Sequence, residues 1–248
     1  MKVLALMLCT GFTCYAGVGF AQEHHLSVSE HEELYTMPAS DQGNRQSPVN
    51  IVSSDSKHAT IHKVTFNYHP STKTIVNLGH AIQVKYDDGN TLGYEGQVYD
   101  FKQFHFHTPS EHLIDGITYP MELHMVHTLK QKGDQGPVYL VVGLLFKEGK
   151  ANPFLDKFLN AIPDSTGATN HLSNEYININ ELLAQAGVLH YYHYNGSLTT
   201  PPYTETVTWL LVKHIFEASP EQIEKLNRLE GNNARHFQEL HDRKVDNN

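Results

Sequence analysis

Short runs of alternating apolar and polar residues, separated by Pro, Gly, Asn and Asp, fill the chain from Ser47 onward. Such runs are typical of β-strands whose successive side chains point to opposite faces of a sheet. They read VTFNYHP, TIVNL, AIQVKYDDGNTLGYEG, VYDFKQFHFH, MELHMVHTL, VYLVVGLLF and TVTWLLVKHI. The DDGN stretch predicts a hairpin, and the continuous apolar run VYLVVGLLF favours a central strand covered on both faces.

Two segments carry helix signals. NPFLDKFLNAI begins at Asn152 and has apolar residues at helical spacing. Residues 220–229 are preceded by a capping-box pattern of Ser219 and Gln222 and followed by Gly231, which predicts the clearest helix. Loops are expected over residues 163–180 and 194–202. No linker separates the β regions, so the pattern predicts a mainly β (α+β) fold, one domain with a large sheet and short peripheral helices.

The first 21 residues have the features of a secretory signal peptide. One lysine precedes a short apolar run, and small residues stand before Gln22, which predicts cleavage after Ala21. An uncleaved N-terminal anchor is the alternative. Residues 22–43 are polar and aperiodic and are expected to form an N-terminal arm. Both cysteines lie in the signal, so a periplasmic or secreted mature chain would depend on core packing instead of disulfides.

Charge and hydropathy exclude several partners. The formal net charge of −9 is spread along the chain, so nucleic acid and anionic membrane surfaces are poor partners. No segment after the signal is apolar enough to span a bilayer.

The stretch QFHFHTPSEH suggests a metal site. A residue period of two places Gln103, His105 and His107 on one strand face. With 18 histidines in the chain, one such pair is expected by chance. In MELHMVH the same period places Glu122 with His124. If the two strands are neighbours, three imidazoles can meet and leave a fourth position open, as in catalytic zinc sites.

The alternative is that His124 is an ordinary core or surface histidine. Gln103 and Glu122 each stand two residues before a candidate ligand, where they could hold the second nitrogen of a ligating imidazole. Glu122 on a core face would otherwise be a costly buried charge.

Eight motifs occur in one order between about residues 44 and 245: QSPVNI, GHA, QFHFH, SEH, ELHMVH, NGSLTTPP, VTWLLV and GNNAR. Together they resemble the α-class carbonic anhydrases. The resemblance implies a domain over residues 44–248, built around a large, twisted, mixed but mostly antiparallel sheet. It also implies zinc-dependent reversible hydration of carbon dioxide to bicarbonate and a proton. The expected route is attack by zinc-bound hydroxide, with one Zn²⁺ per chain and a histidine proton shuttle.

The resemblance also implies a role for each matching residue. The zinc ligands would be His105, His107 and His124. Their supports would be Gln103, Glu122 and the backbone carbonyl of Asn233. The catalytic set would comprise Thr199, whose hydroxyl orients the hydroxide, Glu111, which accepts the Thr199 proton, and His80, the proton shuttle. The substrate side would comprise Thr200 and an apolar wall of Val126, Val141, Leu198, Val207 and Trp209.

The chain departs from the family pattern at several points. It lacks the Trp-Gly-Tyr element that usually precedes the QSP motif. Tyr203 stands where secreted relatives often have a disulfide cysteine, and His236 stands where a proline is usual.

Two other functions stay open. One is a non-catalytic binding module of the same fold. The other is a periplasmic zinc buffer, suggested by the histidine-rich arm with His24, His25 and His31. Some bacterial relatives pair as dimers, so a homodimer is a further expectation by analogy.

Overall fold

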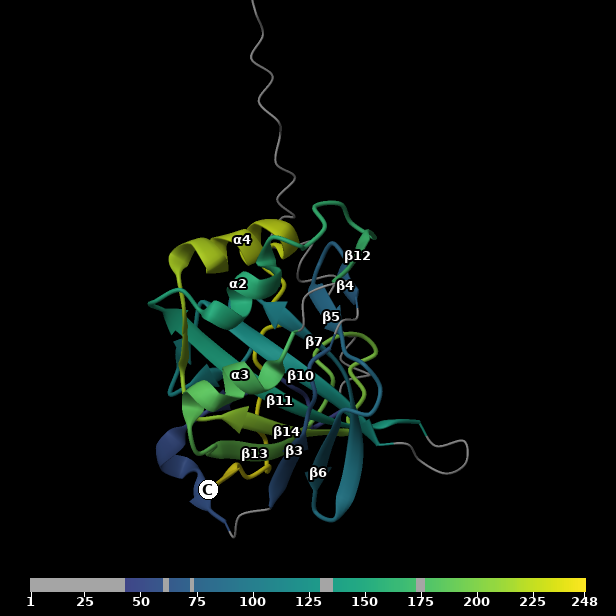
Figure 1. Ribbon diagram of the computed structural model, residues 1–248. Helices are drawn as coiled ribbons and strands as arrows, with labels where there is room; N and C mark the ends of the chain where they lie inside the picture. Colours follow the sequence, from purple (N-terminus) through teal and green to yellow (C-terminus); the bar gives the residue numbers. More distant parts are fainter. Residues whose placement is uncertain (1–42, 60–62, 72–73, 130–135, 173–176) are drawn as a thin grey trace, which may run out of the picture.

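The computed structural model describes residues 43–59, 63–71, 74–129, 136–172 and 177–248 (Figure 1). The predicted signal peptide and all of the predicted arm except Gly43 lie outside the described residues. Within the described ranges, no helix is long and apolar enough to cross a membrane.

A 13-stranded sheet runs through the molecule in the order β12-β4-β5-β7-β10-β11-β14-β13-β16-β2, and β15, β3 and β6 pair alongside this path. The pairs β11–β14, β11–β15 and β16–β2 are parallel and the other pairs are antiparallel, which confirms the predicted mixed sheet. Its strands are β2 (Lys57–His58), β3 (Val64–Asn67), β4 (Thr74–Asn77), β5 (Ile82–Lys85), β6 (Thr91–Tyr94), β7 (Gln97–His107), β10 (Met121–Leu129), β11 (Val138–Glu148), β12 (Thr169–His171), β13 (Tyr191–Gly196), β14 (Val207–Val212), β15 (Phe216–Ala218) and β16 (Asp246–Asn247). A separate three-stranded sheet contains β1 (Asn50–Ile51), β8 (Leu113–Ile114) and β9 (Ile117–Thr118).

Three α-helices are described: α2 (Pro153–Leu159), α3 (Ile179–Leu183) and α4 (Pro220–Glu230). Short 3₁₀ turns cover Ser53–Asp55 and Ala184–Ala186. The two predicted helices are confirmed as α2 and α4, and α4 begins with the capping box that the sequence indicates. The helix α3 and the strands β12 and β13 overlap the two segments predicted as loops. The strands β12 and β13 are held by pairing with β4 and β14, which a weak local pattern does not reveal, and α3 is a five-residue helix capped by Asn178.

The hairpin predicted at DDGN is wrong. The strands β5 and β6 on either side of it do not pair with each other, and both pair with β7. β7 is 11 residues long, so two four-residue strands fit end to end along it. Main-chain hydrogen bonds from Tyr86 N to Lys102 O and from Phe101 N to Asn90 O connect both ends of the DDGN turn to β7. The turn therefore separates two strands that lie along the same side of β7, and the hairpin is formed by β6 and β7 instead.

The two faces of the central strands have different surroundings. In β11 the side chains of Leu140, Val142 and Leu144 enter the larger apolar cluster, whereas Val141 and Leu145 enter a second, smaller cluster. The larger cluster includes the buried faces of α2, α3 and α4, which lie together on one side of the sheet in Figure 1. Side chains on the opposite sheet face are thereby available for a site.

Candidate metal centre

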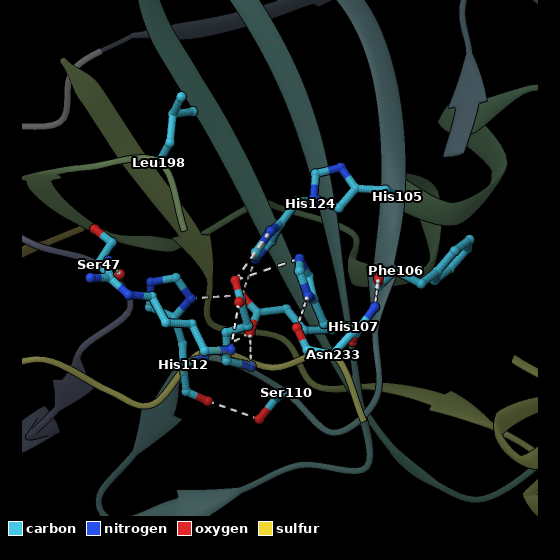
Figure 2. Close-up of polar contacts among 12 residues, drawn as sticks. Ser47, His105, Phe106, His107, Ser110, His112, His124, Leu198 and Asn233 are labelled. Atoms are coloured by element: carbon cyan, nitrogen blue, oxygen red, sulfur yellow. Dashed lines mark hydrogen bonds and ion pairs between the residues drawn. The ribbon is translucent and has the colours of Figure 1, made fainter. Parts of the chain in front are cut away.

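The three candidate histidines converge on the sheet face away from the helices. Pairing of β7 with β10 sets His105 directly opposite His124, and Glu122 opposite His107. The ring centroids are 5.0 Å apart for His105 and His107, 5.3 Å for His105 and His124, and 4.6 Å for His107 and His124. One nitrogen from each ring lies within 4.8 Å of the other two (Figure 2). The predicted meeting of the histidines from two neighbouring strands is therefore present.

Each ring has its other nitrogen engaged by the protein. The contacts are His105 Nδ1 with Gln103 Oε1 at 2.9 Å, His107 Nδ1 with the Asn233 carbonyl oxygen at 3.4 Å, and His124 Nε2 with Glu122 Oε1 at 2.7 Å. Since carbonyl and carboxylate oxygens only accept, each engaged nitrogen carries the proton. The lone pairs of His105 Nε2, His107 Nε2 and His124 Nδ1 are left for a ligand. Gln103, Glu122 and Asn233 thus lie where the sequence-based assignment expects them.

The donor set fits a zinc ion. Among the described residues, His107 Nε2 and Glu111 Oε2 are buried polar atoms without a hydrogen-bond partner, 3.5 Å apart. Burial lowers the pKa of His107 to about 4 and lowers the pKa values of His105 and His124 as well. All three imidazoles are therefore neutral at pH 7, the state in which they coordinate metal. Three neutral imidazoles with second nitrogens held in place match the composition of a catalytic zinc site.

Glu122 is the centre of a buried hydrogen-bond network. Besides the hydrogen bond from His124, its carboxylate accepts one from His112 Nδ1 at 2.7 Å. It also accepts the backbone N–H groups of Glu111 and His112 at 2.9 and 2.8 Å. Burial by itself raises the pKa of Glu122, but the two neighbouring histidines and their hydrogen bonds bring it well below its usual range. The far side of the His112 ring lies 2.6 Å from the Tyr194 hydroxyl. Figure 2 shows His112 of this network beside His107 and His124.

The predicted catalytic residues lie around the same point. Thr199 is buried, and its hydroxyl hydrogen-bonds to Glu111, which also accepts the backbone N–H of Arg235 at 2.9 Å. Burial raises the pKa of Glu111 to about 7, against the lowering effects of His124 and these hydrogen bonds. Thr200, the next residue, is exposed.

His80 is exposed on the turn after Gly79. Its backbone carbonyl accepts the Asn233 side-chain amide at 2.8 Å. Burial is the largest cause of the lowered pKa of His105, and charge–charge interactions with His107, His124 and His80 add to it, so the His80 ring lies within electrostatic reach of the triad.

The five residues predicted as an apolar wall form part of one cluster. Val141, Val207 and Trp209 are buried in it, and Val126 and Leu198 pack against it partly exposed. The Trp209 ring lies 4.8 Å from the His124 ring, and its Nε1 donates to the Ser197 carbonyl at 3.1 Å. The wall therefore adjoins the triad.

Three comparisons place these motifs in a family. The protein-family sequence model described as eukaryotic-type carbonic anhydrase matches residues 30–248. The chain is 42% identical to a carbonic anhydrase of Neisseria gonorrhoeae over 205 residues, which is 82% of this chain and 77% of the relative. The chain belongs to the α-carbonic anhydrase family. The α-carbonic anhydrase of Thermovibrio ammonificans, solved with the inhibitor sulfanilamide, superposes with a TM-score of 0.76 at 40% identity, over 82% of this chain and 87% of the other. A carbonic anhydrase of a Nostoc strain is 36% identical over 82% of this chain and 75% of the relative.

Several residues of this carbonic anhydrase site are absent from the set inferred from the sequence. His112 and Arg235 belong to the SEH and GNNAR motifs, but the sequence alone assigns no role to either residue. The Arg235 guanidinium group lies 3.8 Å from the centre of the Tyr203 ring and donates to the Ser47 carbonyl at 2.7 Å. Arg235 of the GNNAR segment thus holds Tyr203 by a cation–π contact and the QSP segment by a hydrogen bond. These long-range contacts give no periodic signal in the sequence.

Proposed function

We propose that this chain catalyses the reversible hydration of carbon dioxide with one zinc ion bound to His105, His107 and His124. The observation that carries the proposal is the arrangement of the three rings. Three unprotonated nitrogens face one point, and each ring is fixed through its other nitrogen. A zinc ion bound there would act as a Lewis acid that lowers the pKa of water to about 7, for which carbonic anhydrase is the standard example.

In the proposed reaction, Thr199 and Glu111 orient the attacking oxygen. Glu111 accepts the Thr199 hydroxyl proton, so the Thr199 oxygen can only accept a hydrogen bond from its other neighbour. That constraint directs the lone pairs of the attacking oxygen toward the substrate carbon. It also disfavours anions that have no proton to donate. Thr200, exposed beside Thr199, is proposed to contact bicarbonate.

Carbon dioxide is small and nonpolar, and the apolar wall is proposed to hold it. Val126, Val141, Leu198, Val207 and Trp209 offer no hydrogen-bond donor to the site, since the indole N–H is engaged by Ser197. Bicarbonate is charged and gains nothing from such a wall, which favours its release after the reaction.

His80 is proposed to transfer the proton to buffer. Its ring is exposed yet electrostatically coupled to His105. Imidazole is the side chain that exchanges protons near neutral pH. The His80→Ala variant should lower kcat, and small imidazole buffers should partly restore it. An unchanged kcat would mean that another group carries the proton.

The function is tested by metal analysis and stopped-flow hydration of carbon dioxide with the purified chain. One zinc per chain and rapid hydration, abolished by chelation and restored by zinc, are expected. Zinc-loaded protein without hydration activity would favour the non-catalytic binding module. Several weakly bound zinc ions that disappear on deletion of residues 22–32 would favour the zinc buffer.

Export is a further proposal. It depends on the signal-like residues 1–21, and it predicts a mature chain that begins at Gln22. N-terminal sequencing of protein from a periplasmic extract tests it. A homodimer is also proposed, by analogy with bacterial relatives, and sedimentation of the mature chain tests it.

A further inference from the structure

Glu230 is a buried carboxyl group with no role in the mechanism described above. It is the last residue of α4, and only 4% of its surface is exposed. No Lys, Arg or His of the described residues forms a salt bridge with it. A buried acid without a cationic partner is costly, so its contacts call for an explanation.

The carboxyl group joins two strands that lead to the site. Its Oε2 atom accepts the backbone N–H of Ile82 at 3.0 Å, and its Oε1 atom lies 3.3 Å from the Thr108 hydroxyl. Ile82 begins β5, two residues after His80. Thr108 directly follows His107 at the end of β7. One side chain therefore links the turn that carries His80 to the strand that carries His107.

Asn233 makes a second connection between the same two segments. Its side-chain amide donates to the His80 carbonyl at 2.8 Å and to the Phe106 carbonyl at 3.1 Å, and its Oδ1 atom accepts the Thr108 N–H at 3.0 Å. Its backbone carbonyl faces His107, as Figure 2 shows. Glu230 and Asn233 thus form a clamp at the end of α4, with two connections between the turn and the ligand strand.

The Glu230 contacts share the proton of one hydroxyl group. The Thr108 hydroxyl has one proton, and it lies 3.2 Å from the Gly231 carbonyl as well as 3.3 Å from Glu230. The Thr108 oxygen also accepts the Asn227 side-chain amide at 3.3 Å. Its single proton therefore goes to the Glu230 carboxyl group or to the Gly231 carbonyl, while the second carboxyl oxygen accepts from Ile82. Burial raises the pKa of Glu230 well above its usual value, and the hydrogen bonds from Ile82 and Thr108 oppose this rise.

We propose that Glu230 is a positioning residue that fixes the His80 turn relative to His107 through Ile82 and Thr108. The inference rests on the proposed role of His80 as the proton shuttle. Without the carboxyl group the Ile82 N–H loses its partner. Asn233 is then the one side chain of the clamp that still ties the turn to the end of the ligand strand, beyond the β5–β7 pairing that begins at Gln83. A small displacement of His80 lengthens the path for the proton but leaves the metal ligands and the apolar wall in place.

The test compares two substitutions of Glu230. Glu230→Leu removes both hydrogen bonds at similar volume, and we expect it to lower kcat by about 3- to 30-fold, as small misplacements of reacting groups do, without changing kcat/KM or zinc content. Glu230→Gln can still accept from Ile82 and donate to Thr108, so it should keep most of kcat. Imidazole buffer should partly restore kcat in Glu230→Leu. If that variant does not fold, Glu230→Asp, whose shorter side chain cannot span both partners, should show the same selective loss of kcat.

Two controls separate positioning from general stability. Gln222→Ala removes buried hydrogen bonds at the opposite end of α4 and should leave kcat unchanged at a temperature where it is folded. In a His80→Ala background, Glu230→Leu should cause no further loss of kcat, as expected for two residues that act through one step.

The outcomes distinguish the inference from the proposed function. If His80→Ala slows turnover but the folded Glu230 variants keep wild-type kcat, the inference is overturned and the shuttle stands. If they lose kcat/KM and zinc in parallel with kcat, Glu230 supports the metal ligands and the inference is also wrong. If His80→Ala has no effect, the shuttle assignment fails, and the positioning role fails with it.

Discussion

Two buried histidines on strand β10, His124 and His127, lie only three residues apart but face opposite sides of the sheet. His124 faces the metal centre, whereas His127 faces the helix side, among the aromatic rings of Tyr68 and Phe101. Both His127 nitrogens are engaged, with Nδ1 donating to the Leu140 carbonyl at 3.1 Å and Nε2 lying 2.7 Å from the Tyr68 hydroxyl. His124 has one nitrogen on Glu122 and the other directed at the triad. A histidine whose two nitrogens are both satisfied is structural, and one with an open lone pair beside two others can bind a metal.

Burial and charge state do not separate the two histidines. Burial lowers the pKa of His124 and brings the pKa of His127 to about 3, so both rings are neutral at pH 7. The difference lies in the neighbours: a carboxylate and two imidazoles on one face, and a phenol and a main-chain carbonyl on the other. Substitutions on each face should therefore affect different quantities.

The largest effect is expected for His124→Ala. It removes one of three ligands and should abolish most zinc binding and lower hydration activity at least about 100-fold, beyond the usual loss from an outer hydrogen-bond partner. Zinc analysis and stopped-flow hydration measure both quantities. His127→Leu is the matched control on the other face and should keep its zinc while losing stability. Zinc loss of equal size in the two variants would contradict the comparison.

The next effect concerns the partner that orients each histidine. Glu122→Gln replaces the carboxylate that accepts from His124 and His112, and it should weaken zinc binding about 10- to 100-fold. Competition with a chelating dye measures the affinity. Tyr68→Phe removes the corresponding partner of His127 and should cost about 1 kcal/mol of unfolding free energy with unchanged zinc affinity. Unaltered affinity in Glu122→Gln would show that His124 does not need its carboxylate.

The pH dependence of stability should distinguish His127 from any surface histidine. The unfolded chain takes up a proton on His127 near pH 6.5, but the folded chain does so only near pH 3. The stability that neutral His127 contributes is therefore complete above pH 6.5 and falls as the pH drops toward 3. Between pH 7 and pH 5 the loss should be about 2 kcal/mol.

Denaturant unfolding of metal-free protein at several pH values measures this loss. The double variant Tyr68→Phe, His127→Phe should show a shallower decrease than the parent, since the triad titrates in both and cancels from the difference. If the unfolding free energy of the parent and of the double variant fell equally with pH, the pKa of His127 would not be lowered in the folded chain.

The period of two places His105 with His107 and Glu122 with His124, but it leaves open whether the two strands are neighbours, and the full ligand set comes from the family resemblance. The structure supplies the register that sets His105 opposite His124, with a shift between Val126 and His127. The same rule separates His124 from His127, whose positions on β10 differ by an odd number of residues. Contacts between distant segments could not be predicted this way. Neither the Tyr203–Arg235 contact nor the link from Glu230 to Ile82 leaves a local pattern. The hairpin predicted at DDGN was wrong because these residues indicate a turn but do not determine which strands pair beside it.

The smallest loss of zinc affinity is expected opposite the two histidines, on strand β11. Leu140 lies opposite His127, but Gly143 lies opposite His124. A Cβ atom on Gly143 would lie 2.6 Å from Leu211 Cδ1 and 3.1 Å from Glu122 Oε1, so a methyl group there would press on the carboxylate that holds His124.

Gly143→Ala should therefore cost about 1–3 kcal/mol of stability through overpacking and weaken zinc binding by several-fold. Thermal unfolding with and without zinc measures both. Gly136→Ala, where a Cβ atom would have no neighbour within 4 Å, is the control and should change neither. If Gly143→Ala lowered stability equally with and without zinc, the glycine would serve packing against Leu211 alone. Zinc affinity would then be insensitive to a methyl group pressing on Glu122, just as it is expected to be insensitive to loss of the Tyr68 hydroxyl.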